Sequence, residues 1–159
     1  MKILLNNQTL SKTLRPFSDI GFVPTMGALH DGHLSLVEKA EIECDAVVVS
    51  VFVNPTQFND PNDLANYPRN EEKDAKLLQE AKCDIMFVPT AQDIYPNESK
   101  PEFELNALDS VLEGTHRPGH FNGVVQVVDK LFQIVKPNSA YFGQKDFQQL
   151  AIINKVSCR

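Results

Sequence analysis

The stretch that decides the fold comprises residues 20–33 and reads IGFVPTMGALHDGH. Its first four residues are a short strand candidate, which we expect to stop at Pro24 because proline lacks the N–H that a neighbouring strand would bind. Residues 33–44 follow with apolar side chains at helical spacing, and Gly27 and Gly32 lie between the two elements. The stretch therefore predicts a strand, a glycine-containing loop and a helix in succession.

Strands and helices alternate along the rest of the chain in the same way. Residues 46–53 (AVVVSVFV) are almost wholly apolar and β-branched, which is typical of a central parallel strand buried on both faces. Residues 54–68 contain three prolines and several Asn and Asp residues, which predicts mostly loop. Further predicted elements are strands 84–88 and 139–142 and helices 70–83, 122–136 and 146–156. The alternation predicts an α/β fold, an open parallel sheet with helices on both faces, as one domain over residues 1–159.

Composition and charge exclude several classes of protein. The 159 residues are 42% hydrophobic and 23% charged, which is ordinary for a globular chain and excludes disorder. A net charge of -6 argues against a nucleic-acid binder that neutralises phosphates. No apolar run approaches the roughly 20 residues of a membrane helix, and the N-terminus turns polar too early for a secretory signal. The lack of such a run predicts that the protein does not act at a membrane. Three widely spaced cysteines predict a reduced, cytoplasmic protein.

Ligands of open parallel sheets bind beyond the carboxyl ends of the strands. The loops expected to share that edge are residues 24–33, 54–58, 89–96 and 143–146. Of these, the glycine-containing loop carries the clearest chemistry.

The two glycines have the spacing of a Walker A loop, but His33 and Leu34 stand where that motif has Lys and Ser or Thr. The amine that grips phosphates and the hydroxyl that binds magnesium are therefore both missing. What remains is a His-x-Gly-His pattern at a helix start, whose imidazoles can donate to phosphate oxygens and stabilise a leaving pyrophosphate. A purely structural turn with two surface histidines would give the same pattern.

A metal site is not predicted. His116 and His120 flank Pro118 and Gly119, which would break any helix that placed both imidazoles on one face. No cysteine lies near either histidine pair in the sequence, so zinc ligation is the weaker interpretation.

Polar residues on the other loops have both a functional and a structural interpretation. The Gln57 amide suits a small substrate with hydroxyls and a carboxylate, although water can satisfy a loop amide equally well. Arg117 suits a carboxylate or phosphate, beside a turn that precedes a long helix. Asp146 and Gln149 have the spacing of a helix capping box, which would still leave Lys145 free to bind phosphate.

Motifs spread along the chain resemble those of the pantothenate synthetase (pantoate–β-alanine ligase) family of nucleotidyltransferases. They are PTMGALHDGH at 24–33, NPTQF at 54–58, DLANYPR at 63–69, RPGHF at 117–121 and GQKDFQQL at 143–150. His-x-Gly-His alone indicates only nucleotidyl transfer, and the longer strings narrow the resemblance. Together they cover residues 23–150 and imply a Rossmann-like fold of the HIGH nucleotidyltransferase type.

The resemblance implies an ATP-dependent condensation of pantoate with β-alanine to pantothenate, through pantoyl adenylate, with release of AMP and pyrophosphate. ATP and Mg²⁺ are the implied cofactors, and pantoate and β-alanine the implied substrates. The implied catalytic residues are His30, His33 and Lys145. The implied ATP-binding residues are Met26, Gly27, Ala28, Leu29, His30, Asp31, Gly32, His33, Gly143, Gln144, Lys145 and Asp146. The implied pantoate- and β-alanine-binding residues are Pro24, Met26, Phe52, Asn54, Gln57, Arg117, His120 and Gln149.

The sequence departs from the family in length. Family members continue into another strand, a Ser-Ser-Arg-containing loop that closes over ATP, and a smaller C-terminal domain, none of which follows Arg159 here. We therefore expect an N-terminal ATP- and pantoate-binding domain that turns over poorly by itself. Another His-x-Gly-His nucleotidyltransferase and a non-catalytic nucleotide-binding module are the alternative interpretations. The resemblance also implies a homodimer.

Overall fold

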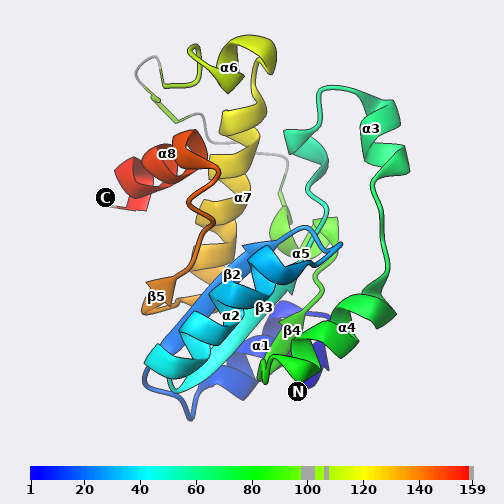
Figure 1. Ribbon diagram of the computed structural model, residues 1–159, viewed down its shortest axis with the longest axis vertical. Coiled ribbons are helices and arrows are strands. Elements are labelled where there is room, and N and C mark those ends of the chain that lie inside the picture. Colours follow the sequence, from blue (N-terminus) through cyan, green and yellow to red (C-terminus); the bar gives the residue numbers. More distant parts are fainter. Residues whose placement is uncertain (98–102, 106–107, 158–159) are drawn as a thin grey trace.

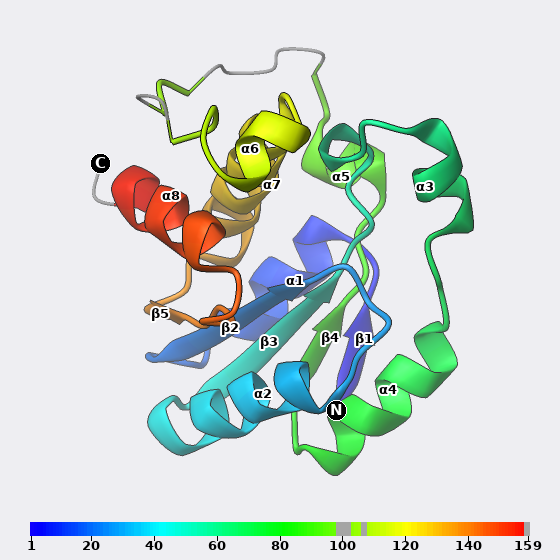
Figure 2. The same ribbon diagram turned by 45° about the horizontal axis from the view of Figure 1, so that its top comes forward.

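The structure is a computed structural model that describes residues 1–97, 103–105 and 108–157, and its centre is one parallel sheet (Figure 1). The strands are β1 (Lys2–Leu4), β2 (Ile20–Thr25), β3 (Ala46–Val51), β4 (Ile85–Phe87) and β5 (Ser139–Ala140). Their order is β1–β4–β3–β2–β5, and every pairing between neighbours is parallel (Figure 2). The predicted open parallel sheet is confirmed.

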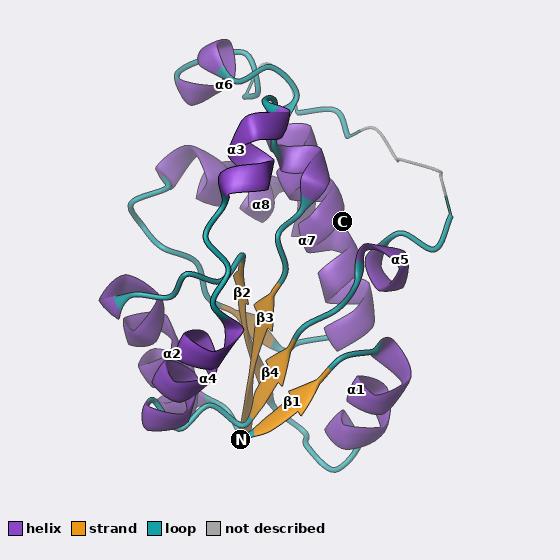
Figure 3. Cartoon of the chain, turned by 90° about the vertical axis from the view of Figure 1, so that its right-hand side faces the viewer, coloured by secondary structure: helices purple, strands orange, loops and turns teal. Residues whose placement is uncertain are grey.

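Helices cover both faces of the sheet (Figure 3). On one face lie α2 (Asp31–Glu43) and α4 (Glu71–Glu80), and on the other α1 (Asn7–Leu14), α7 (His120–Val135) and α8 (Phe147–Ser157). Short helices η1 (Pro55–Gln57), α3 (Pro61–Asn66), α5 (Ala91–Ile94) and α6 (Glu113–His116) lie in the connections. In the described part of the chain, no helix has the length and apolar character to cross a bilayer.

The central strand β3 divides the core into two clusters. All six of its residues are buried, as the run of β-branched residues predicts. Val48 and the following Phe52 face the α7 side, whereas Val47 and Val49 face α2 and α4. This alternation is the period of two expected of a strand, so both faces of the sheet are packed with apolar side chains.

Strand β2 was expected to stop at Pro24, but it continues to Thr25. The ladder with β3 runs through Pro24, which lies opposite Ser50. Phe22, two residues earlier on the same edge, accepts a hydrogen bond from Tyr141 on the β5 side. Among the described residues, β5 pairs only with Gly21 and Phe22 of β2, so the missing N–H of Pro24 faces an edge without a partner strand there and costs no ladder bond.

Other element boundaries also differ from the predictions. β1 and α1 were not predicted, because a strand of three residues and a helix of eight carry little periodicity. η1 and α3 lie in the stretch 54–68 that was expected to be mostly loop. Helix α2 begins two residues early, at Asp31, because the His30 side chain caps it by accepting from the Gly32 N–H at 3.1 Å.

The two described cysteines, Cys44 and Cys83, are free thiols, and Cys158 lies outside the described residues. Burial raises the pKa of Cys83 to about 12, so its thiol stays protonated at neutral pH. Cys83 therefore serves as a core residue.

Candidate active site

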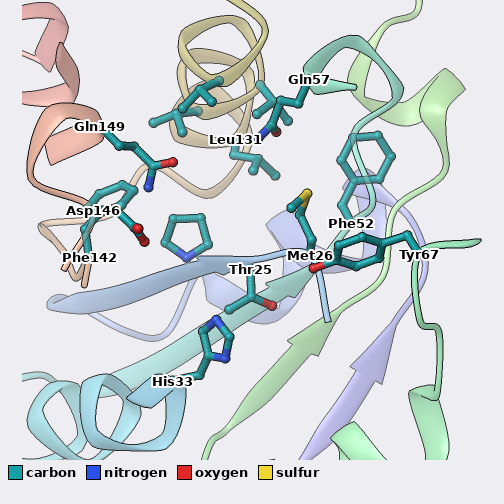
Figure 4. Close-up of a pocket in the computed structure, with 14 residues that line it drawn as sticks. Thr25, Met26, His33, Phe52, Gln57, Tyr67, Leu131, Phe142, Asp146 and Gln149 are labelled. Atoms are coloured by element: carbon teal, nitrogen blue, oxygen red, sulfur yellow. The ribbon is translucent and has the colours of Figure 1, made fainter. Parts of the chain in front are cut away.

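A pocket of about 180 Å³ lies at the carboxyl ends of β2 and β3 (Figure 4). It brings together seven residues singled out from the sequence: Pro24, Met26, His33, Phe52, Gln57, Asp146 and Gln149. Figure 4 shows Asp146 and Gln149 on one side, Met26 and Phe52 on the other, and His33 below them. Segments that lie more than a hundred residues apart in sequence thus meet at the predicted edge of the sheet.

The apolar wall of the pocket comes from α7, which sequence reasoning assigned only to the core. Its lining residues are Val124, Val127, Val128 and Leu131. Their spacing of three and four residues puts them on one face of the helix, and the same four belong to the core cluster. Thr25, Tyr67 and Phe142 also line the pocket and were not predicted. Tyr67 lies within the DLANYPR motif, which was the available signal.

The glycine-containing loop uses its main-chain donors internally. Gly27 and Ala28 both adopt left-handed backbone, with φ of 81° and 52°. The Gly27 N–H donates to Thr25 Oγ1 at 3.2 Å. The Ala28 and Leu29 N–H groups donate to the Asp74 carboxylate at 3.0 and 2.8 Å. These three N–H groups are therefore not available to phosphate in the way those of a P-loop are, and the adjacent imidazoles are the anion donors of this loop.

The two imidazoles of the loop lie against each other. The ring centroids of His30 and His33 are 4.1 Å apart. His30 is exposed at the start of α2, whereas His33 is half-buried and its buried Nδ1 has no hydrogen-bond partner among the described residues. Burial, and then the charge of His30, lower the pKa of His33, while the carboxylates of Asp74 and Asp146 act in the opposite direction. A buried imidazole nitrogen without a partner is a group that an incoming ligand can satisfy.

Gln57 is held by a buried network centred on Asn54. The fully buried Asn54 amide donates to Gln57 Oε1 at 3.0 Å and to the Gly123 carbonyl at 3.1 Å. Its Oδ1 accepts from the Tyr95 hydroxyl at 3.0 Å. Asn54 therefore lies behind the pocket lining, although it was expected to contact substrate. Because Gln57 Oε1 is already bonded, its NH₂ is the group left to donate into the pocket.

A second cavity of about 310 Å³ adjoins the first and shares Met26, Gln57, Tyr67, Asp146 and Gln149 with it. The predicted residues Arg117 and His120 line this cavity, together with Tyr67. His120 Nδ1 lies 2.8 Å from the Gln57 carbonyl oxygen, and Arg117 pairs with Glu113 at 2.8 Å. Burial lowers the pKa of His120, so its neutral imidazole donates to that carbonyl.

The remaining predicted ATP-binding residues lie on the two loops that border the pocket. Lys145 and Gln144 are exposed beside Asp146, on the segment that leads into α8. Asp31 and Gly32 form the exposed first turn of α2. In the described part of the chain, no group of three or more His, Cys, Asp or Glu side chains could hold a metal ion.

Comparison with known proteins places the chain in a family. A family model described as pantoate-beta-alanine ligase matches residues 2–158. A curated pantothenate synthetase from Porphyromonas gingivalis is 58% identical over 137 residues, which are 86% of this chain and 49% of that protein. The one from Azobacteroides pseudotrichonymphae is 54% identical over 158 residues, 98% of this chain and 56% of that protein.

Solved structures agree with this result. The crystal structure of pantothenate synthetase from Thermus thermophilus has a TM-score of 0.91 and a sequence identity of 46%. The match covers 98% of this chain and 56% of that chain. The crystal structure of pantoate-beta-alanine ligase from Francisella tularensis, complexed with beta-gamma ATP and beta-alanine, has a TM-score of 0.93 and a sequence identity of 46%. This match covers 98% of this chain and 61% of that chain. This chain thus spans about half the length of the curated relatives it matches. It belongs to the pantoate–β-alanine ligase family.

Proposed function

We propose that this chain is the ATP- and pantoate-binding part of an AMP-forming pantoate–β-alanine ligase. The observation that carries the proposal is the pocket in which two glutamine amides, Gln57 and Gln149, and one imidazole, His33, lie beside an apolar wall. Pantoate has a carboxylate and a hydroxyl at one end, a second hydroxyl at the other end, and a carbon with two methyl groups between them. A pocket with donors on one side and valine side chains on the other suits such a molecule.

The proposed reaction has two steps. A pantoate carboxylate oxygen attacks the α-phosphorus of ATP, the bond to the β-phosphate oxygen breaks, and pantoyl adenylate and pyrophosphate form. The β-alanine amine then attacks the acyl carbon, the bond to AMP breaks, and the amine loses a proton as the amide forms. Positioning of the reactants and stabilisation of phosphate charge are the main demands of the first step.

The loop and α8 side chains suit the phosphates of ATP. His30 and His33 lie together, and the unpartnered Nδ1 of His33 is a buried polar atom that a ligand would satisfy. Lys145 supplies a nearby exposed cation on the opposite loop. Mg²⁺, when bound, would neutralise phosphate charge. Its ligands would be mainly phosphate oxygens, as is usual for magnesium in nucleotide sites.

The substrate residues divide between the two cavities. In the first, Gln57 and Gln149 would hold the pantoate hydroxyls and carboxylate, and Pro24, Met26 and Phe52 would contact its two methyl groups. In the second, Arg117 and His120 would line the space for β-alanine, whose carboxylate suits a guanidinium. The assembly as a homodimer and a location in the cytoplasm are further parts of the proposal.

The test is a calorimetric titration of pantoate into the chain, with and without an ATP analogue and magnesium. We expect binding that Gln57→Ala and Gln149→Ala weaken, and that Gln57→Glu weakens more, because its carboxylate would replace the donating NH₂. Gln133→Ala is the matched control, since Gln133 is exposed on α7 and, among the described residues, its side chain bonds only its helix neighbour Asp129. Nucleotide binding without any response to pantoate would instead indicate a nucleotide-binding module.

A further inference from the structure

We propose that Asp74 is a positioning residue for the adenylation step, a role that rests on the function proposed above. Asp74 lies on α4, outside the five motifs that resemble those of the family. Its carboxylate fixes the bend at residues 27–29, and this bend leads directly into His30 and His33. Asp74 therefore acts through the two imidazoles and not on the substrates.

The contact is a two-point clamp on the main chain. Asp74 is 1% exposed, and each carboxylate oxygen accepts one N–H, Oδ2 from Ala28 at 3.0 Å and Oδ1 from Leu29 at 2.8 Å. Ala28 has a φ of 52°, a backbone conformation that residues other than glycine rarely adopt. The clamp thus stabilises a bend that the local sequence alone disfavours.

The surroundings leave the clamp little freedom. A Cβ on Gly27 would lie 2.9 Å from Asp74 Oδ2 and 3.0 Å from a methyl of Val51, so loop and carboxylate are in close contact. Leu78 on α4 and Leu29 on the loop are both buried in the same core cluster. Helix α4 is therefore anchored by the core, and a carboxylate on it is a fixed reference point for the loop.

The negative charge of Asp74 also acts on the His33 imidazole. In the described part of the chain, the carboxylate has no ion-pair partner, and the two N–H groups are its neutralising contacts. The charged and titratable neighbours of His33 are His30, Asp74 and Asp146, and the Asp74 charge raises the pKa of His33 against the effect of burial. The clamp thus supports the imidazolium that a bound phosphate would favour.

Two substitutions separate geometry from charge. Asp74→Asn removes the charge and leaves one N–H without an acceptor, whereas Asp74→Glu keeps the charge but adds a methylene to a space without room. We expect each to lower pantoate-dependent exchange of pyrophosphate into ATP on the order of 100-fold, as expected for misplaced catalytic groups, with the pantoate dissociation constant unchanged. Asp84→Asn is the matched control, because Asp84 also accepts a distant N–H, that of Val47, but at the amino end of the strands.

Histidine signals in NMR spectra give a readout that does not depend on turnover. We expect the imidazole signals of His30 and His33 to move in both variants, with the pKa of His33 lower in Asp74→Asn than in Asp74→Glu. The signals of His116 and His120 should stay in place. In the unsubstituted chain, the Ala28 and Leu29 amide protons should exchange slowly with solvent.

The outcomes distinguish the two proposals. Folded Asp74 variants with unchanged exchange and unmoved His30 and His33 signals would overturn the role of Asp74. Rapid amide exchange at Ala28 and Leu29 would do the same, even if neither variant folds. Histidine signals that move as expected, in a chain without any pyrophosphate exchange, would support the clamp and contradict the proposed adenylation.

Discussion

At the residue scale, the buried and unpartnered Nδ1 makes the His33 imidazole a group that a ligand would satisfy. We expect His33→Ala to lower pantoate-dependent pyrophosphate exchange on the order of 100-fold, the usual cost of removing one preorganised donor. The free energy of unfolding should change by less than about 1 kcal/mol, because His33 is half-buried and its Nδ1 has no partner to lose among the described residues.

Exchange assays and urea unfolding on the same preparations measure both quantities. The control is His116→Ala, since His116 is exposed in α6. Equal losses of stability and activity in His33→Ala would contradict the assignment.

The buried histidines also predict a pH dependence of stability. The pKa values of His33 and His120 are lowered, chiefly by burial, from the ordinary 6.5 of the unfolded chain. At pH values between 6.5 and the folded pKa values, the unfolded chain therefore binds more protons than the folded chain does. This part of the stability is fully present above pH 6.5 and is lost as the pH falls through the folded values.

Urea unfolding at about pH 7.5 and about pH 5.5 measures the effect, since the interval brackets histidine titration. We expect the free energy of unfolding to fall less over this interval in His120→Gln than in the unsubstituted chain. His116→Gln should keep the full dependence. An identical fall in all three proteins would show that burial of His120 does not carry the effect.

The sequence predicted the residues that line the pocket better than the residues that hold them in place. His33, Gln57 and Gln149 line the pocket as expected, because their motifs are local strings. Asn54 and Asp74 act behind the lining, through contacts 69 and 46 residues away in sequence. Such contacts depend on how elements pack, so no local spacing predicts them.

At the scale of elements, the approach of α7 to η1 positions the Gln57 segment. A Cβ on Gly123 would lie 2.4 Å from the Thr56 carbonyl oxygen, a main-chain atom that cannot move alone. We expect Gly123→Ala to cost about 3 kcal/mol, the upper end of what overpacking costs, and to weaken pantoate binding through Gln57.

Urea unfolding and calorimetric titration measure these two effects. For the stability measurement, the matched variant is Gly143→Ala, because a Cβ there meets nothing within 4 Å. Unchanged stability in Gly123→Ala would mean that the two elements can separate without cost.

The long elements were predicted, and so were the short strands β4 and β5, whereas β1, α1 and the short connecting helices were not. Strand β3 and helix α7 carry long apolar patterns, which predicted their type and their burial. The predicted end of β2 was wrong, because the number of hydrogen bonds lost at Pro24 depends on whether a strand lies on the side that its missing N–H faces. Edge position is a property of the whole sheet, and a local pattern does not contain it.

At the scale of the whole molecule, we expect weak turnover by residues 1–159 alone. The chain spans 49% of the Porphyromonas gingivalis relative, and its net charge of -6 disfavours an anionic nucleotide. We expect a chimera that adds the C-terminal half of that relative to turn over at least about tenfold faster than the chain alone, the equivalent of one more charged hydrogen bond.

Release of AMP in the presence of pantoate and β-alanine measures the difference. A chimera with His33→Ala should lose the gain, which would assign the activity to this chain's loop. Equal turnover by the chain and the chimera would mean that residues 1–159 are sufficient.

The valine wall of the pocket has a consequence for how specificity can change. Val124, Val127, Val128 and Leu131 line the pocket and at the same time hold α7 on the sheet. A substitution that reshapes the wall for a different acid also removes packing from the core, by about 1 kcal/mol for each methylene group. We therefore expect evolution or design to find new substrates more readily at the polar rim, at Gln149 or Tyr67, which belong to neither core cluster. Selection for folding alone is enough to keep the apolar half of this pocket in shape.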